Sequence, residues 1–381
     1  MPTTDLVRGR TALVGVGTTQ QGEIPDLGAD EIGVEAFRLA LADSGLAASD
    51  IDGLVTCRSF GGFGIDTVLG RMLGLNPRYS ATLEYGTCNF SLHLAAMAIA
   101  TGMASTVALI YGTNQRTARN RFSTTAGSGS ETADVHGFFN IAGQAAMAFR
   151  RYQHLYGTTE EQLGHVAVTF RAHAQLNPLA IFRDPLTIEQ YLAQPYLVEP
   201  LRRADVCMIS DGGACLILTD ADRAGAARTQ PVYLLGMDQV TGLRQYDNAD
   251  NLMRPWLSGL RRCFDRAGVS RGDIDVLFLQ DPTSVWVLQM LEGLGFCPEG
   301  EAGSFVAEGN IALGGSMPVN TNGGQLSESY MWGWLHLCEA VRQLRGGCGE
   351  RQVPAARFAQ HCSTKGFEKG ATSILGTVIP T

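Results

Sequence analysis

A glycine-rich segment near the end of the chain carries the side chains best suited to chemistry. Residues 320–330 read Asn-Thr-Asn-Gly-Gly-Gln-Leu-Ser-Glu-Ser-Tyr, and a helix-patterned stretch follows as far as Gly346. Loops of this kind often hold binding and catalytic groups. Tyr330 has a phenolic hydroxyl that can donate a hydrogen bond or pass on a proton. We therefore predict an active-site loop; the alternative is that Tyr330 only packs beside Trp332 and Trp334.

Metal and disulfide chemistry are not indicated. The nine cysteines are scattered and include no Cys-x-x-Cys pair, and the seven histidines show no metal-binding spacing. We expect no disulfide framework, no metal held by this chain, and mostly buried thiols. The two lysines, Lys365 and Lys369, lie in the terminal loop, which disfavours a Schiff-base aldolase. No phosphate-binding Gly-x-x-x-x-Gly-Lys motif occurs.

Composition limits the class of protein. The chain has 381 residues, 45% hydrophobic and 17% charged, which is enough to bury one large core or two smaller ones. The net charge of −8, without a stripe of Lys or Arg, argues against a nucleic-acid partner. No window approaches the roughly 18 uncharged apolar residues of a membrane span, and residues 1–10 are polar. We expect a cytoplasmic protein.

The elements around the loop indicate an α/β fold, because short Val/Ile/Leu runs alternate with helix-period segments. One unit occurs twice: residues 44–55 recur as residues 267–278, at a constant offset of 223. In each copy a helix ends at a glycine, and an Asp-Ile-Asp turn leads into a strand. We predict two related halves; the alternative is a common αβ unit that arises twice.

Two segments resemble the active-site loops of the thiolase superfamily. Residues 320–330 are similar to its C-terminal loop, Asn-x-x-Gly-Gly followed six residues later by a catalytic histidine, and Tyr330 stands at the histidine's place. Residues 83–89, with the alanine-rich stretch after them, are similar to its nucleophile loop and buried helix. An ungapped match places the nucleophile at Tyr85, and a gap of two or three residues places it at Cys88.

The resemblance covers nearly the whole chain, with further similar segments at residues 12–17, 210–214 and 291–297. It implies an α/β protein with the thiolase fold, in which two duplicated αβ halves form a five-layered αβαβα arrangement. We expect the halves at residues 1–226 and 227–381, with a cap or loop insertion at about 113–205 in the first.

Residues 156–163, 171–174 and 182–185 are most similar to the sterol-carrier/lipid-transfer thiolase-like branch. That branch contains both thiolases and CoA-thioester aldolases. The aldolases cleave steroid side-chain β-hydroxyacyl-CoA by a retro-aldol step, together with a partner that carries an OB-fold and a zinc ribbon. The resemblance thus implies coenzyme A as a thioester substrate, no tightly bound cofactor, a homodimer, and a zinc-ribbon/OB-fold partner protein.

Retro-aldol cleavage needs a base for the β-hydroxyl proton, donors for the enolate and an acid to reprotonate it, but no acyl acceptor. Tyr330 resembles the aldolases' base. Their second tyrosine, just before an aspartate in the second half's first loop, is replaced here by Gln280. Gln280 can hold an oxyanion but cannot accept a proton at neutral pH. Asp281 is expected to bind substrate or to cap a turn or helix.

Thiolysis remains open, because Cys362 lies where thiolases keep their second, proton-shuttling cysteine. Cys88 as nucleophile with Cys362 as acid/base would suit acyl transfer to CoA, whereas in an aldolase Cys362 would reprotonate carbon. Either thiol can equally be a small buried apolar group. The remaining candidates are for substrate binding: Asn320, Gly323 and Gly324 of the loop, and His136 in a polar Gly/Ser-rich stretch.

The favoured function is a CoA-thioester retro-aldolase, a carbon–carbon lyase, that converts a β-hydroxyacyl-CoA with a steroid-side-chain-like, aryl or alkyl group to a ketone or aldehyde and a shorter acyl-CoA. The first alternative is a thiolase or acyltransferase that cleaves a β-ketoacyl-CoA with CoA. The second is a non-catalytic acyl-CoA or lipid carrier subunit.

Overall fold

Two sets of strands, which correspond except that only the first has an additional edge strand, β3, build a nine-stranded mixed sheet in the order β3-β2-β4-β7-β1-β8-β11-β10-β9. The computed structural model describes residues 7–58, 64–84, 88–119, 140–241, 257–366 and 369–380. The first set is β1 (Thr11–Thr18), β2 (Gly53–Cys57), β3 (Tyr79–Leu83), β4 (Thr106–Asn114) and β7 (Asp211–Asp220). The second set is β8 (Val232–Thr241), β9 (Val276–Leu279), β10 (Phe358–Lys365) and β11 (Lys369–Gly376).

The two sets share one topology. β2 pairs with β4 in parallel, and β4–β7 and β7–β1 are antiparallel. β9 pairs with β10 in parallel, and β10–β11 and β11–β8 are antiparallel. The sets meet where β1 pairs with β8 at two positions, Ala12 with Tyr233 and Leu13 with Val232. The chain is therefore built from two related halves, as the sequence repeat predicts.

The repeated sequence unit has the same structure in both halves. Helix α1 (Ala29–Ser44) ends at Gly45 with φ 74°, and α10 (Arg262–Ala267) ends at Gly268 with φ 70°. A 3-10 turn follows in each copy, at Ala48–Asp50 and Arg271–Asp273, and then comes a strand, β2 or β9. Positive φ at these two positions suits glycine, which has no Cβ to clash. The boundary between residues 226 and 227 stays a prediction.

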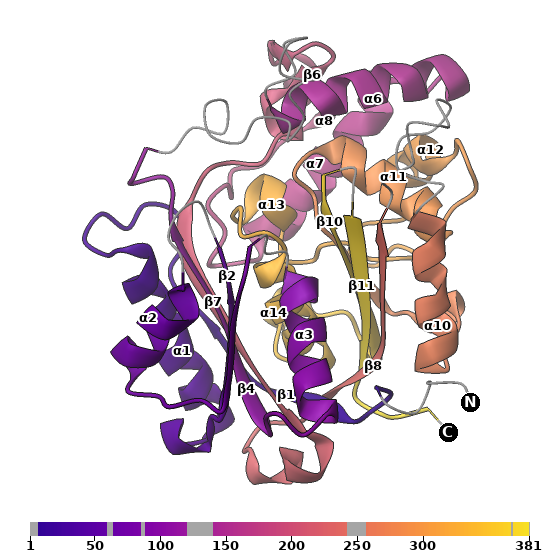
Figure 1. Cartoon of the computed structure of the whole chain (residues 1–381). Coiled ribbons are helices and arrows are strands. Elements are labelled where there is room, and N and C mark those ends of the chain that lie inside the picture. The colour runs from indigo at the N-terminus through magenta and orange to yellow at the C-terminus, as the bar shows by residue number, and fades with distance from the viewer. Residues whose placement is uncertain are drawn as a thin grey trace.

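Three hydrophobic clusters define five layers (Figure 1). One lies between the first-half strands and α1 and α2 (Ile65–Leu73). The central one joins strands of both halves to α3 (Cys88–Ala100) and α14 (Trp334–Leu344). The third lies under α10 and α11 (Ser284–Leu294) on the outer face of the second half. With each set of strands counted as one layer, the order helix, strands, helix, strands, helix confirms the predicted αβαβα arrangement.

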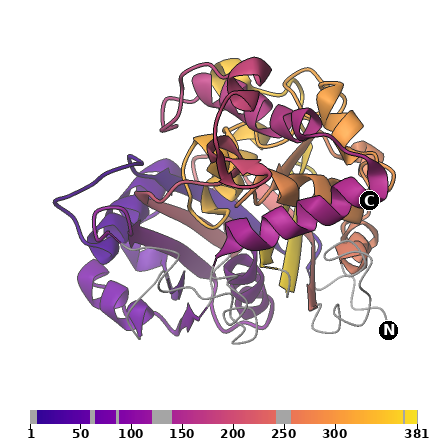
Figure 2. The same cartoon turned by 90° about the horizontal axis from the view of Figure 1, so that it is seen from above.

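A cap belongs to the first half by sequence but covers the second half in space. It contains α6 (Ile141–Tyr156), α7 (Glu160–Gln175), α8 (Ile188–Leu192) and the hairpin β5 (Tyr196–Val198) and β6 (Leu201–Arg202). Helix α7 packs on α11, α12 (Ala302–Ala307) and α13 (Gly324–Ser327). Figure 2 shows α6 lying across the second half, away from α1 and α2.

Two kinds of feature are absent from the part of the chain that the structure describes. None of its helices combines the length and the apolar character that crossing a membrane requires. Nor do three or more His, Cys, Asp or Glu side chains converge there in a way that could hold a metal ion.

Candidate active site

The glycine-rich loop lies at the edge of the sheet where β9 and β10 end, beneath α7 (Figure 1). Asn320 joins the loop to β9 by its own amide: Nδ2 donates to the Leu279 carbonyl (2.8 Å), and Oδ1 accepts from the Leu279 N–H (2.8 Å). The Asn320 N–H donates to the Leu277 carbonyl. Both ends of the amide that was predicted to bind substrate are thus hydrogen-bonded to the last residue of β9.

Gly323 and Gly324 are required by close packing. Both have positive φ, 101° and 64°. A Cβ on Gly323 would lie 2.6 Å from the Ala174 Cβ of α7, and one on Gly324 would lie 2.2 Å from the Asp281 Oδ2. Real Cβ atoms do not approach neighbours this closely, so only glycine lets the loop pass between α7 and Asp281.

Asp281 anchors the loop from below and is completely buried. Its carboxylate accepts from the main-chain N–H of Gln325 (2.9 Å) and of Leu326 (3.2 Å), and from His336 Nε2 (2.9 Å). Desolvation by burial raises the pKa of Asp281, while these hydrogen bonds oppose the rise. Of its two predicted roles, the structure gives Asp281 the cap, because it satisfies the first N–H groups of α13.

Tyr330 lies between α13 and α14, where the two halves meet, and 5% of it is exposed. Its N–H donates to Ser210 Oγ (3.0 Å), which lies 2.7 Å from Ser329 Oγ. The Tyr330 ring centroid is 5.3 Å from that of Trp332. Ser210 directly precedes β7 of the first half. A side chain of the first half therefore binds the main chain of Tyr330, which belongs to the second half.

Cys88 is the first residue of α3 and is fully buried. Its Sγ lies 3.6 Å from Nδ1 of His361, a buried residue of β10. Desolvation by burial, followed by the neighbouring Cys338 and Cys57, raises the Cys88 pKa well above its ordinary value. Burial likewise lowers the His361 pKa well below its ordinary value. Burial thus favours the neutral thiol and the neutral imidazole over a thiolate and an imidazolium.

Gln280 and Cys362 contact each other through the backbone only. The Gln280 N–H donates to the Cys362 carbonyl (2.9 Å), and Gln280 Oε1 accepts from the Thr364 N–H (3.0 Å). The Cys362 side chain belongs to the outer cluster under α10 and α11, on the opposite face of β10 from His361. Burial raises the pKa of the Cys362 thiol. Gln280 is thus bound to β10, next to the loop-binding Asp281, and the Cys362 thiol points away from Cys88.

Two predicted candidates, Tyr85 and His136, lie outside the described residues.

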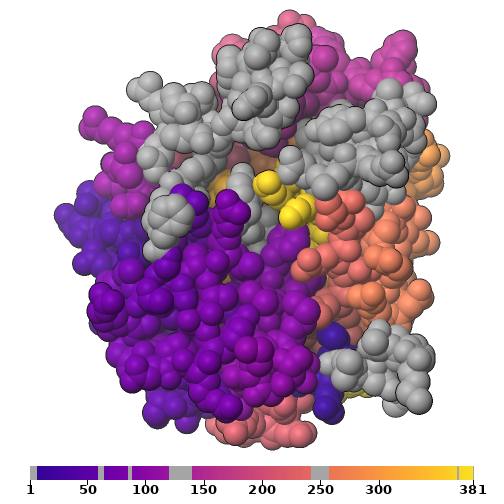
Figure 3. All heavy atoms as spheres, viewed as in Figure 1, coloured from indigo at the N-terminus to yellow at the C-terminus, as the bar shows by residue number. Residues whose placement is uncertain are grey.

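Near the hairpin of β10 and β11, Figure 3 shows atoms of the C-terminal part of the chain, in yellow, reaching the surface where the halves meet.

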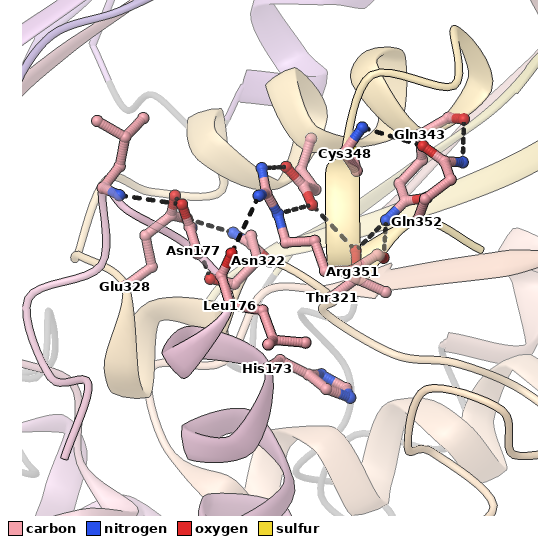
Figure 4. A network of polar contacts seen from close by, with 12 residues as sticks. His173, Leu176, Asn177, Thr321, Asn322, Glu328, Gln343, Cys348, Arg351 and Gln352 are labelled. Atoms are coloured by element: carbon pink, nitrogen blue, oxygen red, sulfur yellow. Dashed lines mark hydrogen bonds and ion pairs between the residues drawn. The ribbon is translucent and has the colours of Figure 1, made fainter. Parts of the chain in front are cut away.

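The sequence did not indicate a buried polar network that ties the loop to α7 (Figure 4). The two oxygens of Glu328 accept from Asn177 Nδ2 (2.8 Å) and from Asn322 Nδ2. Nearby, Glu339 is paired with Arg351 at 2.7 Å. Burial, and then Glu339, raise the pKa of Glu328 to about 7. In the sequence only the Asn-x-Asn-Gly-Gly pattern points to this region. The network itself could not be predicted, because Asn177 and Arg351 come from distant parts of the chain.

His336 is the other residue missed, since it lies in an ordinary helical pattern 55 positions after Asp281. It is buried, and its ring lies edge-on to Phe278 of β9 with a 6.4 Å centroid distance. The His336 and His361 rings are 5.9 Å apart. His336 Nδ1 and His361 Nε2 have no hydrogen-bond partner within the described ranges.

Comparisons with known proteins agree with this architecture. Residues 241–377 match the family model described as thiolase C-terminal domain-like. The chain is 36% identical over 367 residues to the 17-hydroxy-3-oxo-4-pregnene-20-carboxyl-CoA lyase of Mycobacterium tuberculosis (strain ATCC 25618 / H37Rv), covering 90% of this chain and 93% of that protein. The chain belongs to the sterol-carrier branch of the thiolase superfamily.

Further similarities place it among the aldolases of this family. A steroid side-chain-cleaving aldolase of Thermomonospora curvata is 35% identical over 363 residues, which is 89% of this chain and 91% of the relative. The solved structure of the Ltp2-ChsH2(DUF35) aldolase superimposes with a TM-score of 0.88 at 33% identity, covering 98% of this chain and 99% of the other. These findings confirm the superfamily that the two loop segments predict and the branch that residues 156–163, 171–174 and 182–185 predict.

Proposed function

We propose that this protein is a CoA-thioester retro-aldolase that cleaves a β-hydroxyacyl-CoA to a ketone or aldehyde and a shorter acyl-CoA. The observation that carries the proposal is the similarity of about nine-tenths of the chain to a CoA lyase (36% identical) and to a side-chain-cleaving aldolase (35% identical). A thiolase needs a thiolate that accepts an acyl group, whereas a retro-aldolase does not. The burial of Cys88, which raises the pKa of its thiol, agrees with the retro-aldolase.

Tyr330 provides the proton chemistry. In this route Tyr330 acts as its phenolate: the phenolate oxygen takes the proton of the β-hydroxyl group while the Cα–Cβ bond breaks, and the electron pair of that bond moves into the thioester as an enolate. The resulting phenol then gives that proton to Cα, which restores the phenolate, so no proton is gained or lost overall. This route does not use Cys362, whose thiol lies in the outer core. It needs no free CoA.

Gln280 holds the enolate oxygen. Because Thr364 N–H occupies Gln280 Oε1, the amide nitrogen is the end that donates. A fixed donor at a developing oxyanion stabilises the transition state more than it stabilises the substrate. The departure from the aldolases' second tyrosine is thus a change from a phenol donor to an amide donor.

The acyl group we propose is a steroid side chain or another branched β-hydroxyacyl group. Support comes from the substrate in the name of the mycobacterial lyase and from the side-chain cleavage in the name of the Thermomonospora aldolase. The cap helps to shape the acyl pocket, because its helix α7 packs on α13, which lies within the glycine-rich loop.

We also propose a homodimer and a zinc-ribbon/OB-fold partner. β3 is at the end of the sheet order, and an open edge strand can pair with the same strand of a second copy. The name of the Ltp2-ChsH2(DUF35) aldolase supports a DUF35 partner. Co-expression and gel filtration with light scattering will test both assemblies.

The deciding experiment is a product assay by mass spectrometry on β-hydroxyacyl-CoA and β-ketoacyl-CoA panels, with and without free CoA. The proposal expects a ketone or aldehyde from a β-hydroxy substrate without CoA, and no acyl adduct on Cys88. Cleavage only of β-keto substrates, only with CoA, and with an adduct on Cys88 would establish the thiolase instead. The 3.6 Å contact between Cys88 and His361 is the observation that favours this second candidate.

A further inference from the structure

We infer that His336 is a positioning residue of this site, which together with Asp281 clamps both ends of the segment that carries Tyr330. The inference rests on the proposed function for its catalytic consequence, but the clamp itself is a property of the fold. Neither the sequence pattern nor the names of the relatives assign a role to this histidine.

The two ends of the segment converge on one carboxylate. At its start, the N–H groups of Gln325 and Leu326 donate to Asp281 (2.9 and 3.2 Å). At its end, the N–H of Gly333 donates to the Gln325 side-chain oxygen (3.2 Å), and His336 donates to Asp281 from the first turn of α14 (2.9 Å). Tyr330 is therefore carried by a closed loop of main chain whose ends share Asp281.

His336 is fixed more firmly than a surface histidine could be. The residue is 1% exposed, and its ring packs edge-on against Phe278, whose strand β9 leads directly to Asp281. Nε2 faces an oxygen of Asp281, and a hydrogen on Nε2 lets the ring donate to the ionised carboxylate. In the clamp that we infer, His336 is the donor and Asp281 the acceptor.

The carboxylate needs this third donor because it is fully desolvated. A buried carboxylate that loses a donor becomes protonated more readily. A protonated oxygen no longer accepts well from a main-chain N–H, so Gln325 or Leu326 would lose its partner. Loss of the imidazole donor is therefore expected to loosen the start of the segment.

Small displacements of a catalytic group are costly: a misplacement of about 1 Å can lower a rate by about 100-fold. A positioning role predicts a fall in kcat with little change in KM, because the CoA thioester would still bind. A merely structural role predicts a loss of stability without a specific loss of order in residues 324–333.

The test compares His336→Gln, which keeps a donor near the position of Nε2, with His336→Phe, which keeps the volume and removes the donor. His93→Phe is the matched control, because His93 is also buried in the central layer, where it contacts Ser373 (3.0 Å) and Gln239 (2.9 Å) away from the loop. Asp281→Asn is a second variant that weakens the same clamp from the other side, in case His336→Phe does not fold.

Hydrogen exchange of residues 324–333 and steady-state kinetics are measured on all four variants. We expect His336→Phe and Asp281→Asn to exchange at least about tenfold faster in this segment, with kcat about 10- to 100-fold lower and KM within about threefold. His336→Gln should restore protection and most of kcat, and His93→Phe should leave both unchanged at an equal loss of stability.

The inference is overturned if His336→Phe keeps wild-type protection in residues 324–333, or if His93→Phe affects the segment as strongly. Failure of the proposed function has a different signature: the wild-type protein then shows no retro-aldol turnover, while the exchange comparison still reports whether the clamp exists.

Discussion

Glu328→Gln should make the protein's stability less dependent on pH, and the size of the effect can be worked out from the structure. Glu328 lies two residues before Tyr330 and is 3% exposed. Burial, and then the charge of Glu339, raise its pKa from 4.5 to about 7, against the opposing effect of Asn177 and Asn322.

The sign follows from proton binding. Between pH 4.5 and about 7 the folded protein keeps a proton on Glu328 that the unfolded chain has lost. The free energy of unfolding therefore falls with rising pH in this window and is constant, for this group, below and above it. Each pKa unit corresponds to about 1.4 kcal/mol, so the fall amounts to about 3 kcal/mol.

Urea unfolding of wild type and Glu328→Gln at pH 4.5, 5.5, 6.5 and 7.5, at one protein concentration, measures the effect. Relative to the variant, the wild-type protein should lose about 3 kcal/mol across the series, since glutamine cannot titrate. Glu350→Gln, at an exposed position, is the control and should track the wild type. The reasoning would be refuted if the difference in unfolding free energy between wild type and Glu328→Gln changed by less than about 0.5 kcal/mol across the four pH values.

Three further predictions concern the loop and its neighbours. Tyr330→Phe should fold normally and lose about 100-fold or more in kcat for retro-aldol cleavage, as loss of a proton-transfer group does; near-full turnover would remove Tyr330 from the mechanism. Cys88→Ser should keep kcat within about threefold, since no acyl acceptor is needed, and a collapse of turnover would instead favour thiolysis. Gly324→Ala should cost about 3 kcal/mol or more of unfolding free energy, because its Cβ would overlap Asp281, whereas Gly74→Ala, with φ 66° but open space around it, should cost only about 1–2 kcal/mol. Equal losses in the two glycine variants would mean that backbone strain, and not the close approach, requires glycine in the loop.

The fold could be predicted from the sequence because its signals are local. The repeated helix, glycine cap and Asp-Ile-Asp turn each depend on a few adjacent residues, and both copies keep the predicted structure at Gly45 and Gly268. The loop at residues 320–330 was equally visible, since paired glycines after an asparagine indicate a tight turn. For Asp281 the preference of aspartate for turns and helix starts left a cap open beside substrate binding, but nothing in the sequence linked Asp281 to this loop.

The site residues were harder to place because the middle strands are buried on both faces. In β10 every residue from Phe358 to Thr364 is buried, so no alternation of polar and apolar residues shows which side chains face which layer. Cys362 and His361 therefore look equivalent in the sequence, yet they point into different layers. The pairing of His336 with Asp281 is invisible for a related reason, because only the packing of α14 against β9 brings them together.

The hydrogen bonds that hold the loop explain how one scaffold can carry either a histidine or a tyrosine at position 330. Asp281, the Gln325 side chain and Ser210 all bind main-chain N–H groups, those of residues 325, 326, 333 and 330. Main-chain partners are indifferent to the side chain that the residue carries. The loop can therefore keep its position while the residue at 330 changes. We propose that the nature of that side chain, together with the ionisation of Cys88, decides whether the site transfers an acyl group or breaks a carbon–carbon bond by proton transfer alone.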